Sequence, residues 1–392
     1  MLQEQLGFED SNYQQPEIAP QISKRTGVSA SGAMICGMGS AFPQRKYSQQ
    51  EVGALLGINN RTVQKLLAAR HILNRHLYLP EPLPGQTAIA DETQEMLNDK
   101  FDQGVIDIGI RAARQALADS PFRKSEIDFL VCVTSSGFRV PGLSSMIARA
   151  LNLRPELYRL DVVGMGCNAG MSALKTAQTL AKEGQKGILL CCEINSAIYV
   201  RDESIRTGIV NSLFGDGAAA IVLAGASLLE GHQFSSARDS GGFNAEILGF
   251  ESFSIPNQWS AMRFDWNQEQ KKWSFGLSKE IPFVVGDHLN LPVGKLLKKN
   301  GLCTSDIQHW TLHTGGAAVI EGAKKSLGIT DFDVRHTRSV LRDYGNISSG
   351  SFLVSHERLL KEGVIQDQDM GVLIAMGPGA TLEACLVRYH GI

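Results

Sequence analysis

Hydrophobic and polar positions follow a regular order through the middle of the chain. Continuous apolar runs at residues 127–133 and 188–192 are typical of strands that are buried on both faces. Between them, residues 168–183 repeat apolar side chains every three or four positions, which predicts an amphipathic helix that ends before Gly184. Helices that alternate with fully apolar strands indicate βαβ units, so the pattern predicts an α/β fold with a sheet covered on both faces.

Two patterns occur twice along the chain. A glycine turn enters an apolar strand near residue 215 and again near residue 377. A strand, a glycine turn and a helix also follow one another around Cys167 and again around His313. The order and the similar separations indicate two halves of one duplicated unit, although single matches of this kind also arise by chance. We expect a flexible tail at residues 1–30, a first half at 31–235 and a second half at 236–392.

Composition narrows the class of protein. The 392 residues are 43% hydrophobic and 20% charged, which is enough to build a large core and excludes a mainly disordered chain. The net charge of −2 gives no global reason to bind nucleic acid or an anionic membrane. No apolar run is long enough to span a membrane, and the polar N-terminus does not read as a signal peptide.

Cysteine usage indicates the compartment. The seven cysteines are scattered without paired CxxC spacing, which argues against a disulfide framework and against a zinc site. We therefore expect a soluble cytoplasmic protein with no metal, no nucleic-acid partner and no membrane partner.

Cys167 stands where a nucleophile is expected. It follows a predicted strand and a Gly-x-Gly turn, and it precedes the amphipathic helix at 168–183. A helix start presents free N–H groups and the positive end of the helix dipole, which lowers the pKa of a thiol and favours the thiolate. A buried structural cysteine is the alternative, and position alone does not decide between the two.

His313 and Asn346 complete a candidate constellation. His313 ends a predicted strand and precedes two glycines, whereas Asn346 lies in a turn where an asparagine is more often only a turn residue. A cysteine, a histidine and an asparagine on separate turns suggest nucleophilic acyl chemistry with two hydrogen-bond donors for an oxyanion. A papain-like protease also uses these residue types, but Cys167 has neither the local sequence nor the position of such a protease.

Four ordered stretches make the interpretation specific. Together, residues 163–170, 213–220, 313–316 and 341–349 resemble the type III polyketide synthases of the thiolase superfamily, and the resemblance extends from about residue 30 to residue 390. Plant members usually have Gly-Phe-Gly-Pro-Gly at the position of residues 375–379 and His-Pro-Gly-Gly at 313–316. Both departures argue against a plant product built on an aromatic starter.

The resemblance implies a fold and a mechanism. The fold would be a thiolase fold, a duplicated five-layer αβαβα sandwich that works as a homodimer. Cys167 would carry the starter and the growing chain as a thioester. His313 would keep the Cys167 thiolate charged. Together with Asn346 it would hydrogen-bond the thioester carbonyl of malonyl-CoA while it loses CO₂, since fixed donors in a dry pocket stabilise the charge that develops there. No cofactor would be needed beyond the coenzyme A thioesters that serve as substrates.

The resemblance also suggests the residues around the nucleophile. Phe214 and Phe275 would be gatekeepers of the substrate pocket, to which Ser136 and Ser348 would also contribute. Three basic residues would meet the coenzyme A phosphates, although a helix with such charges is more often only solvated; these residues are Lys65, Arg70 and Arg75. Val140 would reach across a dimer interface into the partner's cavity, with an ordinary loop valine as the alternative.

Finer similarity indicates a product. Residues 350–352, 357–359 and 376–379 are most similar to the bacterial synthases that make 3,5-dihydroxyphenylacetyl-CoA from malonyl-CoA alone. An alkylresorcinol or pyrone made from a fatty acyl-CoA starter remains an alternative, so a second acyl-CoA substrate stays open. A single condensation of the ketoacyl-ACP synthase III kind and an inactive scaffold are further alternatives.

Overall fold

The apolar runs that predict buried strands are strands in the structure. They form β4 (Phe129–Thr134) and β6 (Lys186–Glu193), which pair in parallel. The amphipathic stretch between them forms α5 (Ala169–Lys182), and Gly184 follows it with a positive φ of 81°. The computed structural model describes residues 32–202, 204–230 and 243–391, and the statements below concern these residues.

The strands fall into one large sheet and two small ribbons. The sheet has the order β11-β12-β13-β8-β1-β7-β6-β4-β5 among the described residues, and the ribbons pair β2 with β3 and β9 with β10. The remaining strands are β1 (Ala33–Ala41), β2 (Lys46–Ser48), β3 (Asn74–His76), β5 (Tyr158–Val163), β7 (Gly217–Gly225), β8 (Phe243–Ser254), β9 (Met262–Asn267), β10 (Lys272–Leu277), β11 (His309–Leu312), β12 (Met370–Gly377) and β13 (Thr381–Gly391).

The helices cover the sheet and separate its two halves. Besides α5, they are α1 (Gln49–Leu55), α2 (Arg61–Leu67), α3 (Gln94–Ala118), α4 (Leu143–Leu151), α6 (Ile205–Leu213), α7 (Ile281–His288), α8 (Asn290–Lys299), α9 (Ala317–Leu327), α10 (Arg335–Tyr344) and α11 (Ser351–Glu362). No helix among the residues that the structure describes is long and apolar enough to cross a membrane.

The sheet repeats one arrangement twice. In the first half, β4 pairs in parallel with β6, and β6, β7 and β1 then follow as antiparallel neighbours. In the second half, β11 pairs in parallel with β12, and β12, β13 and β8 again follow as antiparallel neighbours. The halves meet where three residues of β1, Ala33–Ile35, pair with β8. The repeated order supports the duplication.

The elements that correspond between the two halves are not the ones that the sequence motifs predict. In the first half, the helix before the antiparallel pair is α5, and in the second half it is α11. The turn of Cys167 therefore corresponds to the turn at Ser348–Gly350 before α11, whereas His313 follows β11, the counterpart of β4. Pairing the Cys167 motif with the His313 motif was wrong, because both are strand–glycine–helix turns but they follow different strands.

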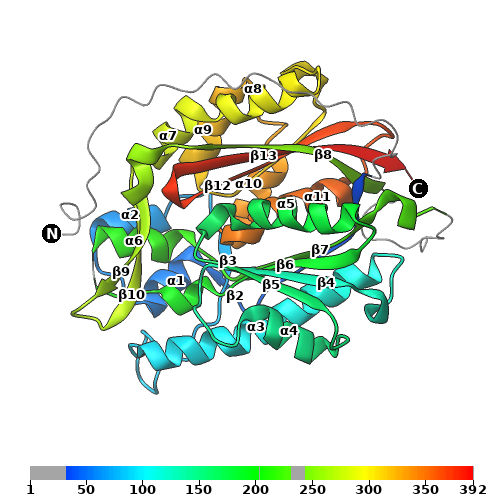
Figure 1. The fold of residues 1–392 in the computed structure, drawn as a ribbon. Coiled ribbons are helices and arrows are strands. Elements are labelled where there is room, and N and C mark those ends of the chain that lie inside the picture. Colours follow the sequence, from blue (N-terminus) through cyan, green and yellow to red (C-terminus); the bar gives the residue numbers. More distant parts are fainter. Residues whose placement is uncertain (1–31, 203, 231–242, 392) are drawn as a thin grey trace, which may run out of the picture. The chain divides into compact units, whose positions relative to one another are not determined.

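Apolar side chains form three cores within the five layers of the fold: a central core and two outer cores. Successive residues of a strand face opposite sides. In β4, Phe129, Val131 and Val133 join the central core with α5 and α11, whereas Leu130 and Cys132 join an outer core with α3 and α4. A second outer core lies under α7, α8 and α9. Figure 1 shows α5 and α11 between the sheet halves, which is the αβαβα arrangement of the predicted thiolase fold.

The predicted limits of the tail and of the two halves lie partly outside the residues that the structure describes. The tail at residues 1–30 lies outside the described residues, and so does the boundary between residues 235 and 236. The described parts of the two halves each contribute one half of the sheet. The exact limits of the two halves stay a prediction.

Candidate active site

Cys167 lies in a short 3₁₀ turn between β5 and α5. The turn spans Gly166–Asn168, and α5 begins at the next residue. Gly166 has a φ of 74°, and a Cβ at this position would lie 2.3 Å from Cδ of Pro378. Only glycine allows this loop to approach the Pro378 turn so closely. The Cys167 side chain is buried at the helix start that the sequence predicts.

Burial controls the charge of the Cys167 thiol. Its Sγ lies 3.4 Å from Oγ of Ser348. Burial raises the pKa of the thiol to about 12, while the hydrogen bond with Ser348 acts in the opposite direction. The expectation that the helix start lowers this pKa is therefore wrong for the resting site, because loss of hydration outweighs the favourable backbone contact. The Cys167 thiol is therefore protonated in the resting site, and a nucleophilic role would need a base.

His313 is the candidate for that base, because it lines the same cavity as Cys167. It follows the last residue of β11, and Nδ1 lies 2.5 Å from Oγ of Ser351. The Ser351 hydroxyl donates to the carbonyl of Ser348 at 2.8 Å, so Nδ1 is the protonated nitrogen and Nε2 keeps its lone pair. Burial lowers the pKa of His313 to about 4, which leaves the imidazole neutral. Among the described residues, no hydrogen bond joins His313 to Cys167 in this resting arrangement.

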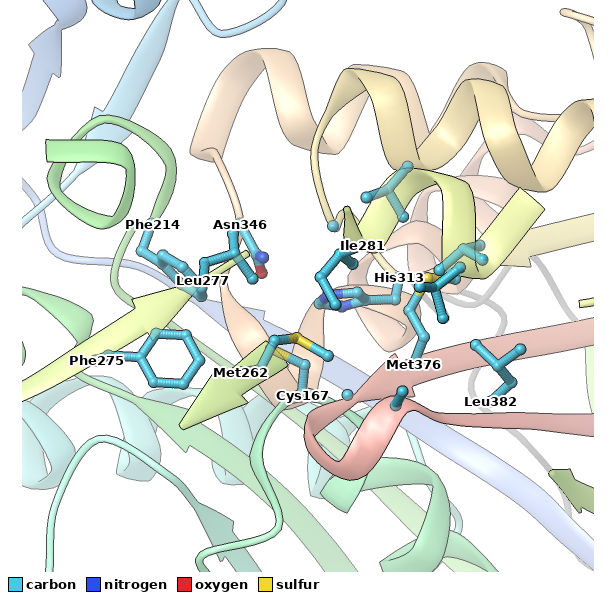
Figure 2. A pocket seen from close by; sticks show the side chains of 16 residues that line it. Cys167, Phe214, Met262, Phe275, Leu277, Ile281, His313, Asn346, Met376 and Leu382 are labelled. Atoms are coloured by element: carbon cyan, nitrogen blue, oxygen red, sulfur yellow. The ribbon is translucent and has the colours of Figure 1, made fainter. Parts of the chain in front are cut away.

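Asn346 presents an amide donor to the same cavity. Its Oδ1 accepts a hydrogen bond of 2.8 Å from the backbone N–H of Ser348, which directs Nδ2 away from that turn. Its backbone bridges to the segment before Gly215, with an N–H donated to Leu213 at 2.9 Å and a carbonyl that accepts from Gly215 at 2.9 Å. Figure 2 shows Cys167, His313 and Asn346 around one cavity, although they come from three separate loops.

Two connected hollows meet at Cys167. One is a narrow apolar space of about 30 Å³ on the side of His313, Asn346 and α7. The other has a volume of about 330 Å³ and is lined on one side by Ser135, Asn195 and Ser348. This volume lies at the small end of the range for ligand pockets, about 300–1,000 Å³. The larger hollow therefore fits a short reaction intermediate.

Phe214 and Phe275 stand between the two hollows. Both are buried, and both line each hollow together with Cys167 and Met262. Their ring centroids lie 5.8 Å apart in an edge-to-face arrangement, and Phe275 also contacts Phe264 at 5.0 Å. The structure thus brings both predicted gatekeepers to the nucleophile, as Figure 2 shows.

The serine positions are only partly as predicted. Ser348 lines the larger hollow beside Cys167. Ser136 does not line the hollows at Cys167, because its hydroxyl donates to the buried carboxylate of Glu193 at 2.9 Å. Its neighbour Ser135 faces the larger hollow instead, with a buried hydroxyl that has no hydrogen-bond partner in the described part of the chain. Sequence reasoning missed Ser135 and Glu193, and the polar break after an apolar strand was the available signal.

The three basic residues do not form one group. Lys65 and Arg70 are exposed on and after α2. Arg75 is completely buried, and its guanidinium bonds only to protein atoms. As a contact for coenzyme A phosphates Arg75 is therefore wrong, because no phosphate outside the protein reaches it. A basic run in a sequence does not reveal that β3 turns one of its residues inward.

Val140 lies on the loop between β4 and α4. Its side chain is fully exposed in the single chain, and the neighbouring Phe138 is 54% exposed. Two exposed apolar side chains on one loop are what a covered interface would need. The structure holds one chain, so the role of Val140 stays a prediction.

Within the described ranges, no group of three or more His, Cys, Asp or Glu side chains is arranged to hold a metal ion. Cys303 is exposed, and the other six cysteines are buried.

Comparison with known families matches both halves of the chain. Residues 21–227 match the family described as chalcone and stilbene synthases, N-terminal domain, and residues 254–390 match the C-terminal domain of the same family.

Individual proteins extend the match to nearly full length. A protein named 3,5-dihydroxyphenylacetyl-CoA synthase from Streptomyces toyocaensis is 42% identical over 389 residues, which covers 96% of this chain and 98% of that protein. A protein of the same name from Amycolatopsis balhimycina is 40% identical over 387 residues, with 98% and 100% coverage. The crystal structure of PKS-I from the brown alga Ectocarpus siliculosus superposes with a TM-score of 0.81 at 23% identity, covering 92% of this chain and 98% of that one, and shares the fold.

Proposed function

Because the chain belongs to the chalcone and stilbene synthase family of type III polyketide synthases, which are malonyl-CoA-condensing acyltransferases, we propose that it condenses malonyl-CoA iteratively on Cys167. The observation that carries the proposal is the convergence of Cys167, His313 and Asn346 on one buried cavity behind an aromatic gate. No metal or redox group is required, since the loss of CO₂ drives each condensation.

The first step is loading of the nucleophile. The Cys167 thiol gives its proton to Nε2 of His313, and the thiolate attacks the carbonyl carbon of an acyl-CoA. The carbon–sulfur bond to coenzyme A breaks, and the leaving sulfur takes the proton from His313. Burial disfavours a charge on either residue alone, so the proton moves within the pair and not to solvent.

The second step is decarboxylation and condensation. The thioester carbonyl of malonyl-CoA accepts a hydrogen bond from Nδ2 of Asn346, and also from His313 when its Nε2 is protonated. The bond to the carboxylate breaks, CO₂ leaves, and the electron pair forms an enolate whose oxygen faces these donors. The enolate carbon attacks the carbonyl carbon of the Cys167 thioester, and the bond from that carbon to Sγ breaks, which releases Cys167 as a thiolate. Transfer of the extended chain back to Cys167 allows another cycle.

The product follows from similarity and from volume. The relatives named 3,5-dihydroxyphenylacetyl-CoA synthase cover nearly the whole chain. A cavity of about 330 Å³ suits a short chain more than a long fatty acyl group. We therefore propose 3,5-dihydroxyphenylacetyl-CoA, or a related short aromatic polyketide, with malonyl-CoA as starter and extender.

One experiment tests this function. The purified protein is incubated with malonyl-CoA alone and then with malonyl-CoA plus acyl-CoA starters of increasing length, and the products are identified by mass spectrometry. We expect an aromatic product from malonyl-CoA alone and no product from Cys167→Ala. Preferential use of a long acyl starter would instead support an alkylresorcinol or pyrone synthase and would overturn the proposed product.

The assembly and the compartment are further parts of the proposal. A homodimer would cover the exposed Val140 and Phe138 of each chain and bring the loop of one protomer towards the cavity of the other. Cysteines scattered without paired spacing suit the reducing cytoplasm. Lys65 and Arg70 remain candidates for contact with coenzyme A phosphates, because both are exposed.

A further inference from the structure

Arg75 is the largest fully buried side chain among the described residues. Its Nε donates to Oε1 of Gln49 at 2.8 Å. Its Nη1 lies 2.9 Å from the hydroxyl of Tyr199, 2.7 Å from the carbonyl of Asn211 and 2.8 Å from the carbonyl of Phe214. Its Nη2 has no hydrogen-bond partner among the residues that the structure describes. The guanidinium is thus bonded almost entirely to neutral acceptors.

Burying the charged guanidinium of Arg75 in the core costs folding free energy. Within the described ranges, no carboxylate lies within ion-pair distance of Arg75, and Asp216 acts on it only from further away. Burial lowers the pKa of Arg75, which shows that the site works against its charge. A buried cation without a paired anion opposes folding, and an apolar side chain of similar size usually serves stability better. A role other than stability explains the residue more directly.

Two of the four acceptors of Arg75, the carbonyls of Asn211 and Phe214, lie at the end of α6. The last carbonyls of a helix have no partner inside the helix and carry its negative dipole. Here the four carbonyls of residues 211–214 are all bonded: Arg75 binds the first and the last, Gln49 Nε2 binds that of Ser212 at 2.8 Å, and the backbone N–H of Asn346 binds that of Leu213 at 2.9 Å. The gatekeeper Phe214 is the C-cap residue of this helix.

The same cap fixes Asn346. Gly345, the residue before it, has a φ of 72°, and a Cβ there would lie 3.0 Å from Cδ of Arg75 and 2.6 Å from the carbonyl of Leu213. The stem of Arg75 therefore packs directly under the turn that carries Asn346. The guanidinium of Arg75 thus binds the backbone of Phe214, and its methylene groups pack against the backbone turn that precedes Asn346.

We propose that Arg75 is a positioning residue that holds the Phe214 gate and the Asn346 amide in one fixed register. This inference rests on the proposed function. It predicts that starter size selection and decarboxylation are coupled, because both depend on the same buried cap. Loss of Arg75 lets the Phe214 segment and the Asn346 turn shift together, which widens the passage and misaligns the donor, while Cys167 and His313 keep their places.

The test uses variants of the full chain. Arg75→Met keeps a straight, apolar stem and removes the guanidinium. Arg201→Met is the matched control, because Arg201 also binds backbone carbonyls, those of Leu56 and Ile89 at 2.8 Å each, but lies on another loop. Tyr199→Phe is a milder second variant, since its hydroxyl donates to the Phe214 carbonyl at 2.5 Å.

Three quantities are measured for each variant and normalised to the fraction of Cys167 that can be acylated: single-turnover loading, release of CO₂ from malonyl-CoA, and the starter preference in a competition of acyl-CoA chain lengths. We expect Arg75→Met to lower the ratio of decarboxylation to loading at least about tenfold and to shift preference towards longer starters. We expect a smaller change of the same direction in Tyr199→Phe, and none in Arg201→Met.

The outcomes separate the two proposals. If Arg75→Met folds and matches Arg201→Met in ratio and starter preference, the positioning role is wrong and Arg75 is only structural. If Arg75→Met does not fold, an unchanged ratio and preference in Tyr199→Phe overturns the role in the same way. If the wild-type protein does not decarboxylate malonyl-CoA at all, the proposed function fails, and the inference built on it fails too.

Discussion

Replacing Asn346 with alanine should separate decarboxylation from loading. In the structure, Oδ1 of Asn346 is held by the N–H of Ser348, and Nδ2 is the group left to face the cavity. His313 is neutral, with its proton on Nδ1, so it is not a ready second donor before it accepts a proton. Asn346→Ala therefore removes the principal preformed donor for the enolate oxygen.

The magnitude follows from that position. Removal of one oxyanion donor from a water-excluded site costs about 2.7–4 kcal/mol of transition-state stabilisation, or about a hundredfold to a thousandfold in rate. We expect a loss of this size in CO₂ release from malonyl-CoA. Loading of Cys167 depends on proton transfer to His313, which does not pass through Asn346, so loading should fall by less than about tenfold.

A second variant separates the lost donor from a damaged loop. Asn346→Asp keeps an oxygen that accepts from the Ser348 N–H, but it offers no donor and places a negative charge near the developing enolate. Its decarboxylation should be as slow as that of Asn346→Ala or slower. Its melting temperature should be nearer to that of the wild type, because the buried N–H keeps its partner.

Two assays measure the steps independently. Intact-protein mass spectrometry follows acylation of Cys167 in a single turnover, and trapped CO₂ measures decarboxylation of malonyl-CoA. Equal losses in both steps would refute the division of roles between His313 and Asn346. A fully active Asn346→Asp would refute the donor assignment itself.

The gate, the buried imidazoles and the exposed loop give three further predictions. Phe214→Ala should widen the passage to Cys167 and favour longer acyl-CoA starters in a competition assay; unchanged preference contradicts the gate. Burial lowers the pKa of His356 to about 3, so its neutral form supports folding fully above 6.5, the usual value, and this support is lost as pH falls. At pH 5 this lowers the free energy of unfolding by ~2 kcal/mol. Urea unfolding between pH 7.5 and 4.5 should show that the free energy of unfolding falls less steeply with falling pH in His356→Leu than in the wild type. Equal pH dependence in the two proteins would argue against this role of His356. Val140→Asp should convert a homodimer into monomers in analytical ultracentrifugation, and a monomeric wild type rules out the interface.

Local patterns in the sequence were enough to predict the elements and to place Cys167 at a helix start. The apolar runs predicted β4 and β6, and the amphipathic period predicted α5, because each pattern reflects burial within a single element. The resemblance brought His313 and Asn346 to Cys167, and the structure places all three around one cavity. These features could be predicted because a strand end and a helix start leave a local trace in the sequence.

Features that depend on contacts between distant segments could not be read in this way. Arg75 is distinguished from Lys65 and Arg70 only by the pairing of β2 with β3, which turns it under the end of α6. Ser135 lines the larger hollow at Cys167 and Ser136 does not, because Glu193, from the neighbouring strand, accepts the hydroxyl of Ser136. In both cases a partner far along the chain decides which of several similar residues faces the site.

The corrected pKa of Cys167 follows from the same distinction and changes the view of the mechanism. A helix start favours a thiolate locally, but closure of the cavity by distant loops removes water and reverses the direction. The same dryness lowers the pKa of His313, so neither charge exists alone at neutral pH. A proton that passes from Cys167 to His313 creates both charges together, and each then stabilises the other in a medium of low dielectric constant. The burial that suppresses the resting thiolate therefore also strengthens the hydrogen bond from Asn346 to the enolate, and one dry cavity serves both steps of the reaction.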